Sequence, residues 1–193
     1  MLKNILETLN KQGYKDLIYT FDVESNLKSE DKNFINDYFS KETINDSRSA
    51  TFFSLGKENL HRKSIVIING NELQNILTGI TETWFQKLNI IVIALYEKYD
   101  DIKTDFIHRV IPNIVKIYED NYKEYESLIL KAAKSYSPTL ITLKYELLDI
   151  KYNYNNLIRS IEKILNSEEE VILYNMADSV ENKKIIIKNI ESK

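Results

Sequence analysis

Residues 64–96 read SIVIINGNELQNILTGITETWFQKLNIIVIALY and contain two apolar runs separated by a segment with helical periodicity. The first run, 64–68, is rich in β-branched residues and ends in an Asn-Gly-Asn turn, and the second run covers 90–95. Such runs are typical of strands buried on both faces. A strand–helix–strand unit of this kind is almost always parallel and right-handed. The residues that repeat at helical spacing between the runs are Leu73, Ile76, Leu77, Ile80, Trp84 and Leu88.

The same alternation continues on both sides of this unit, from the N-terminus to about residue 148. It is typical of an α/β fold with three layers, in which an open, mostly parallel sheet carries helices on both faces. The sequence therefore predicts one such domain over residues 1–148. The other expected strands lie at 17–21, 42–44, 114–118 and 139–143, and the expected helices lie at 2–9, 27–39, 49–60, 73–88 and 122–136.

Residues 149–193 have a different pattern and predict a short C-terminal α/β extension. Apolar spacing indicates a helix at 157–165, a strand at 171–174 and a second helix through 185–190. This is too little structure for an independent core. The extension either docks on the first domain or begins a further domain.

Composition excludes several classes of function. The chain has 193 residues, 43% of them hydrophobic, and a net charge of −3 with acids and bases interspersed, which argues against nucleic-acid binding. Cysteine is absent and the two histidines are far apart, so no metal site or disulfide is expected. The first residues are too charged for a secretory signal, and no apolar run approaches the roughly 20 residues of a membrane span. We expect a cytoplasmic protein without a membrane partner.

Two polar turns follow expected strands, Asp46-Ser47-Arg48 and Asn69-Gly70-Asn71. Ligands of open parallel sheets bind at the carboxyl ends of the strands, so both turns are candidate binding loops. Each also has a simpler interpretation. Asp and Ser are favoured helix N-caps, and Asn-Gly is a common strand-to-helix turn.

The helix expected at 49–60 should place Phe52, Phe53, Gly56 and Leu60 on its inward face. Glycine lacks a Cβ atom, so Gly56 would let a neighbouring backbone approach closely.

Residues 46–56, DSRSATFFSLG, resemble a segment of the pyrimidine-binding (Pyr) domain of thiamine-diphosphate-dependent enzymes. The resemblance is to 2-oxo acid decarboxylases and, above all, to SEPHCHC synthases. These carry an acid-Glu-Arg-Ser-Ala segment followed by an aromatic pair and Leu-Gly. Downstream, the apolar strand at 65–68, the Asn-Gly-Asn turn, Asn75 and the strand at 90–95 follow the family's order and spacing. The resemblance covers about residues 1–148.

The resemblance implies a Pyr domain of a 2-oxo acid decarboxylase or carboligase, present as a fragment or as one component. Its aminopyrimidine pocket would lie at a dimer interface. Thiamine diphosphate would bind with Mg²⁺ supplied by a partner domain, in a homodimer or in a separate diphosphate-binding chain. No Gly-Asp-Gly motif of that partner domain occurs here, so the chain alone is expected to be inactive. The implied cofactor-binding residues are Arg48, Ser49, Ser25, Asn69, Gly70 and Asn75.

The departures from the family concern the chemistry of the site. Ser47 stands where the family has a glutamate, which holds N1′ of the aminopyrimidine and shares a proton with it. A hydroxyl forms hydrogen bonds but does not titrate near neutral pH. Asp46, one residue away, is a possible surrogate. In the early loop expected at 22–26, Glu24 also replaces a family glycine.

These departures leave two alternatives open beside the catalytic one. The chain could be a non-catalytic Pyr-like domain that is kept for dimerisation or regulation. It could also be an unrelated flavodoxin-like binding module, although that would not explain the segment at 46–56.

Overall fold

The computed structural model describes residues 1–96, 113–117, 122–145, 171–174 and 184–187. The chain separates into two compact units, Met1–Asp149 and Ile150–Lys193.

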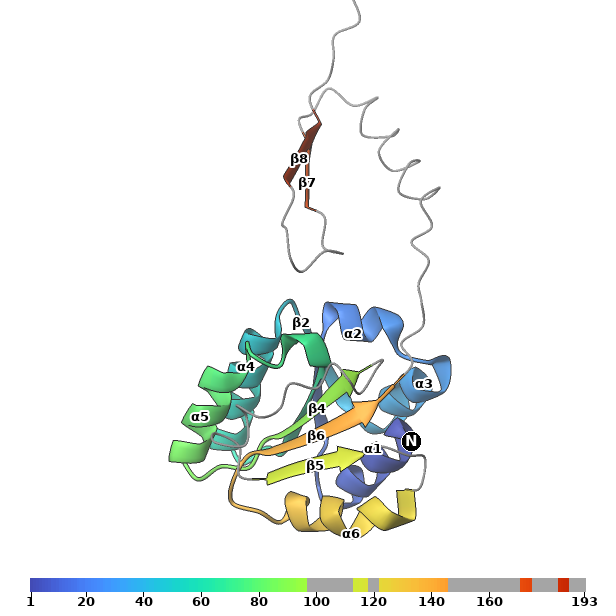
Figure 1. The fold of residues 1–193 in the computed structure, drawn as a ribbon, viewed down its shortest axis with the longest axis vertical. Coiled ribbons are helices and arrows are strands. Elements are labelled where there is room, and N and C mark those ends of the chain that lie inside the picture. Colours follow the sequence, from blue (N-terminus) through green and yellow to red (C-terminus); the bar gives the residue numbers. More distant parts are fainter. Residues whose placement is uncertain (97–112, 118–121, 146–170, 175–183, 188–193) are drawn as a thin grey trace, which may run out of the picture. The chain divides into compact units, whose positions relative to one another are not determined.

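The first unit is built on a six-stranded sheet in the order β2-β1-β3-β4-β6-β5, in which every neighbouring pair is parallel. β1, β3 and β4 are almost entirely buried, as their apolar sequences require. The predicted α/β class with an open parallel sheet is confirmed (Figure 1). The strands are β1 Asp16–Thr20, β2 Ser40–Ile44, β3 Ser64–Asn69, β4 Ile91–Tyr96, β5 Asn113–Ile117 and β6 Thr139–Lys144.

Helices cover both faces of the sheet, and each face has its own core (Figure 1). Residues of α1, α3 and α6 pack with Leu17 and Tyr19 on one face, while residues beside and within α4 and α5 pack with Ile18 on the other. Alternate strand residues point to opposite faces, which produces three layers. The helices are α1 Leu2–Lys11, α2 Phe21–Asn26, α3 Ser29–Tyr38, α4 Ser47–Asn59, α5 Leu77–Phe85 and α6 Tyr122–Ala133, with a 3-10 turn η1 at Gly70–Glu72.

Residues 22–26, expected as a loop, belong to the helix α2. The Ser25 hydroxyl donates to the Phe21 carbonyl at 2.6 Å, and the Asn26 amide donates to the Asp22 carbonyl at 2.9 Å. Asp22 and Glu24 lie in the first turn, where acidic side chains favour the helix dipole. This segment therefore continues directly from β1 into a helix.

The inward face of α4 differs from the expected one. Phe52, Phe53 and Leu60 are exposed. The buried face contains the small residues Ser47, Ala50, Thr51 and Ser54 together with Leu55, Lys57 and Glu58.

The close approach expected at Gly56 occurs at Gly79 of α5 instead. Nothing lies within 4 Å of the position that a Cβ atom on Gly56 would take, whereas one on Gly79 would lie 2.6 Å from Cγ2 of Thr51. The helix expected over 73–88 is also shorter, because η1 and a turn precede α5. Trp84, predicted on its inward stripe, is 46% exposed.

In the second unit, β7 Val171–Tyr174 pairs antiparallel with β8 Lys184–Ile187. The strand at 171–174 was predicted. The helix preferred through 185–190 is wrong for 185–187, because this run of β-branched isoleucines favours a strand once a partner strand is present. The helix expected at 157–165 lies outside the described residues.

Candidate functional site

Three connections leave the carboxyl edge of the sheet and contain the candidate residues. β1 leads into α2, β2 leads through Asp46 into α4, and β3 leads into η1. Because β2, β1 and β3 are adjacent and parallel, these connections begin at the same edge. This is the edge where open parallel sheets bind ligands.

Asp46 is the N-cap of α4. One carboxylate oxygen, Oδ1, accepts from the backbone N–H of Ser49 at 2.8 Å. This backbone hydrogen bond, with further help from the Ser49 side chain, holds the pKa of Asp46 below its ordinary value. The predicted N-cap is confirmed, and the carboxylate is occupied by its own helix.

Ser47 is the first residue of α4 and has no exposed surface. Its hydroxyl oxygen is buried and makes no hydrogen bond of regular geometry within the part of the chain that the structure describes. Buried polar atoms are nearly always paired, and the group that lies within reach of this hydroxyl is the carboxyl of Glu72.

Glu72, the last residue of η1, faces Ser47. Burial, the largest effect, raises the pKa of the Glu72 carboxyl, and the hydroxyl and backbone N–H of Ser47 lower it in part. The negative charges of Asp22 and Asp46 raise it further. Oε2 of Glu72 is buried, and apart from Ser47 no hydrogen-bond partner is found for it among the described residues. The site therefore contains a carboxyl group that binds a proton more readily than one in water.

Sequence analysis missed Glu72 because the turn that carries it was judged by Asn69, Gly70 and Asn71 alone. The available signal was its place as the first acidic residue after β3, at the carboxyl edge. Its contact with Ser47, 25 positions earlier in the sequence, depends on how the two connections meet in space.

Asn69 and Gly70 have structural roles in this turn. The Asn69 side chain accepts from the Asn71 backbone N–H at 3.0 Å, which closes the turn. A Cβ atom on Gly70 would overlap the ring of Tyr96 at the end of β4. Glycine at this position is thus required by packing against the neighbouring strand.

The remaining predicted residues lie apart from the Ser47–Glu72 pair or on the surface. Arg48, Ser49 and Asn75 are exposed. Ser25 donates its hydroxyl within α2 and lines a separate pocket of about 250 Å³. That pocket is also lined by Tyr19. The Tyr19 side chain packs on the face of the sheet covered by α1, α3 and α6, and α4 lies on the other face. The structure therefore brings Asp46, Ser47 and the Gly70–Glu72 turn together but separates Ser25 from them.

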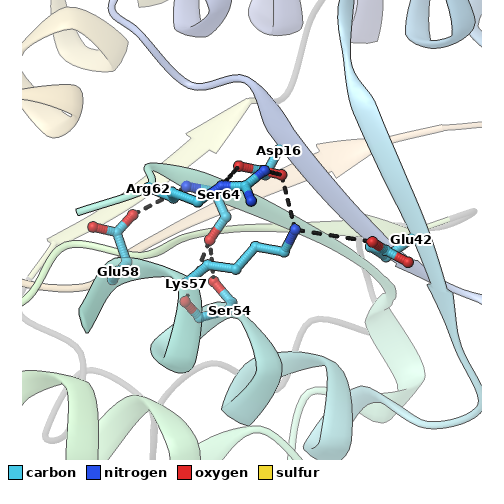
Figure 2. A network of polar contacts seen from close by, with 7 residues as sticks. All are labelled: Asp16, Glu42, Ser54, Lys57, Glu58, Arg62 and Ser64. Atoms are coloured by element: carbon cyan, nitrogen blue, oxygen red, sulfur yellow. Dashed lines mark hydrogen bonds and ion pairs between the residues drawn. The ribbon is translucent and has the colours of Figure 1, made fainter. Parts of the chain in front are cut away.

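A second polar cluster lies where β1 and β3 begin, at the opposite edge of the sheet (Figure 2). Asp16 receives hydrogen bonds from Lys57 Nζ at 2.8 Å and from Arg62 Nε at 2.9 Å. Glu58 accepts from the Ser64 backbone N–H at 3.0 Å. Its place at the amino edge, with the Asp16 carboxylate held by Lys57 and Arg62, indicates that this cluster stabilises the fold.

Comparisons with known proteins leave the site without an assigned family. No protein-family model matches the chain, and no curated protein matches it. The described residues contain no group of three or more acidic or histidine side chains that could hold a metal ion. Among the helices that the structure describes, none is both long enough and apolar enough to cross a membrane.

Proposed function

We propose that the first unit is a Pyr-type domain of a thiamine-diphosphate-dependent 2-oxo acid decarboxylase or carboligase. The observation that carries this proposal is the buried Ser47 hydroxyl beside the partly buried Glu72 carboxyl at the sheet's carboxyl edge. One of the two residues, Ser47, lies in the segment 46–56 that resembles the Pyr family. A hydroxyl and a carboxyl that lie together at this edge suit a polar ligand.

The residues present fit the aminopyrimidine half of the cofactor. Ser47 and Glu72 offer a hydroxyl and a carboxyl to a ring that presents both donors and acceptors. When bound, thiamine diphosphate supplies the nucleophilic carbon for cleaving or joining 2-oxo acids. This chain would bind and orient the pyrimidine ring and exclude water from it.

The diphosphate and its Mg²⁺ would be held by a partner, because the sequence lacks the Gly-Asp-Gly motif of the diphosphate-binding domain. The partner is a second copy with a further domain, or a separate chain. The cysteine-free composition suits assembly of this enzyme in the cytoplasm.

One observation favours the second candidate, a non-catalytic Pyr-like domain kept for dimerisation or regulation. Ser47, at the position of the family glutamate, has no exposed surface. In a domain without a cofactor, a small buried residue here would serve packing alone.

Titration of the full chain with thiamine and with thiamine diphosphate, followed by the backbone amide resonances, tests the proposal. We expect both ligands to bind with similar dissociation constants on the order of 1 mM, because only the shared pyrimidine ring is recognised. Mg²⁺ should change neither affinity. The amides of Ser47 and Glu72 should shift.

Two results would contradict the proposal in different ways. Absence of binding by either ligand would favour the non-catalytic domain. Tight, Mg²⁺-dependent binding of thiamine diphosphate alone would show that this chain contains a complete diphosphate site.

A further inference from the structure

The connection between β1 and β2 contains two helices, α2 and α3, that enclose a pocket of about 250 Å³. One wall comes from α2, through Phe21, Glu24 and Ser25. The other wall comes from α3, where Lys32 and Asn36 lie four positions apart and therefore on the same side of the helix. This volume has room for a small organic ligand rather than for a single water molecule.

Much of the pocket lining is apolar. Tyr19 of β1, Leu27 and Ile35 line the pocket and are buried. Phe21 lines it as well but is 55% exposed, so a ligand that covers its ring would remove apolar surface from water. The pocket therefore suits a ligand with an apolar body.

Glu24 fixes the shape of the pocket. Its two carboxylate oxygens accept from hydroxyls of neighbouring strands, from Tyr19 at 3.1 Å and from Thr43 at 2.7 Å. Tyr19 and Thr43 are register partners in the β1–β2 pair. Burial and the bond to Glu24 raise the pKa of Tyr19 to about 12, so its hydroxyl keeps its proton at neutral pH. These bonds hold α2 against the sheet without using a lysine of the pocket.

Lys32 and Lys41 bring positive charge to the pocket. Lys32 Nζ donates to the Ser25 carbonyl at 2.9 Å, and Lys41 Nζ donates to Asn36 Oδ1 at 2.6 Å. Both acceptors are neutral, and neither lysine forms an ion pair within the part of the chain that the structure describes. An ammonium group has three N–H donors, so each lysine can still donate to a ligand.

The charges of the lining define the ligand further. Two lysines and one glutamate line the pocket, which leaves a net charge of +1. A monoanion balances this charge, whereas a dianion such as phosphate would also be repelled by Glu24.

We propose that this pocket binds a small monocarboxylate with an apolar body. The carboxylate accepts hydrogen bonds from the ammonium groups of Lys32 and Lys41. The apolar body packs against Phe21, Leu27 and Ile35.

This site is separate from the one at Ser47 and Glu72 and does not depend on the proposed function. Tyr19, Leu27 and Ile35 belong to the core on the face of the sheet covered by α1, α3 and α6. Ser47 begins α4, which lies on the other face.

Titration of the full chain with sodium benzoate, followed by the backbone amide resonances, tests the inference. The dissociation constant should be on the order of 1 mM, as expected for a small fragment. The amides of Ser25, Lys32 and Asn36 should shift, and those of Ser47 and Glu72 should not. Benzamide, which has the same ring without the charge, should bind at least about threefold more weakly, and so should inorganic phosphate.

Two lysine variants and a control test the role of the positive charges. Lys32→Met and Lys41→Met should each weaken benzoate binding by about threefold to tenfold, between the values for an exposed ion pair and a charge-assisted hydrogen bond. Lys15→Met is the matched control, because exposed Lys15 also donates to an asparagine Oδ1, that of Asn10, at 2.6 Å and lies outside the pocket. It should bind benzoate as wild type.

A fourth variant gives a change in the opposite direction. Glu24→Gln removes the negative charge, and its amide can still bond the hydroxyls of Tyr19 and Thr43, which accept as well as donate. It should tighten benzoate binding by about twofold to fivefold. A general loosening of the pocket would weaken binding instead.

Several results would overturn the inference. These are no benzoate binding at about 10 mM, equal affinity for benzamide, or amide shifts confined to Ser47 and Glu72. Equal weakening by Lys15→Met and Lys32→Met would show that only the net charge of the chain matters. If Lys32→Met does not fold, the exposed Lys41→Met decides, and wild-type affinity in that variant overturns the inference.

Discussion

Replacing Asp16 with asparagine should destabilise the first unit by about 3 kcal/mol. Asp16 is only 3% exposed and is bonded to Lys57 Nζ at 2.8 Å and to Arg62 Nη2 at 2.6 Å (Figure 2). Removing one partner of a buried ion pair costs about 3–5 kcal/mol, because the other charge stays buried without compensation. The charge left behind is that of Lys57, which is 9% exposed and keeps only a longer ion pair, at 4.0 Å, with the half-exposed Glu42.

Two features place the expected cost at the lower end of that range. The Arg62 side chain is 54% exposed and can turn its charge toward water. The asparagine carbonyl can still accept one hydrogen bond from Lys57, which offsets about 1 kcal/mol.

Urea unfolding followed by the fluorescence of Trp84, the only tryptophan, measures this cost within the first unit. Glu7→Gln is the matched control, because it removes one negative charge and breaks the Glu7–Lys11 ion pair of the same 2.8 Å length. Both side chains of the Glu7–Lys11 pair are solvent-exposed. The control should therefore change the unfolding midpoint little, since exposed pairs contribute little.

The pH dependence gives a second measurement. Burial by itself would raise the pKa of Asp16, but hydrogen bonds from Lys57 and Arg62 and their charges hold it below the ordinary 3.8. The contribution of Asp16 is therefore present above pH 3.8 and is lost as the pH falls through the lower pKa of the folded state. A difference between wild type and Asp16→Asn below about 0.5 kcal/mol at neutral pH would contradict the reasoning, because that is the range of ordinary surface substitutions.

Three other substitutions test the packing and titration of the first unit by the same unfolding measurement. Gly70→Ala should destabilise it by about 1–3 kcal/mol, because the new methyl group overlaps the Tyr96 ring, and unchanged stability would show that the ring moves freely. Gly56→Ala should stabilise it by about 0.5–1 kcal/mol, because the position is helical and open, and a loss would indicate a hidden contact. Burial raises the pKa of Glu58 from 4.5 to about 7, so the stability of the wild type should fall by about 3 kcal/mol relative to Glu58→Gln as the pH rises from 4.5 through about 7. The glutamine side chain can still accept from the Ser64 backbone N–H. If the stabilities of wild type and Glu58→Gln change in parallel with pH, the raised pKa is refuted.

The amino-acid sequence by itself determined the layered parallel architecture of the first unit. Apolar runs such as 64–68 and 90–95, bounded by turn residues, favour strands buried on both faces, and the periodic segment between them favours a helix. These are local patterns, as is the N-cap at Asp46, which is specified by a side chain and a backbone N–H three residues apart. The strand β8 shows the limit of such patterns, because a short isoleucine run is compatible with both helix and strand until a partner strand is present.

Only the tertiary structure decided which residues share the candidate site. Helical spacing did not show which face of α4 is buried. The glycine that packs closely against a neighbouring helix is Gly79 of α5, not Gly56 of α4. Ser47 and Glu72 belong to separate connections, and nothing in either local segment specifies their contact. They meet because β2, β1 and β3 are adjacent and parallel, which brings the connections after β2 and β3 to one edge of the sheet. A site built from several connections depends on strand order, and strand order is a property of the folded sheet.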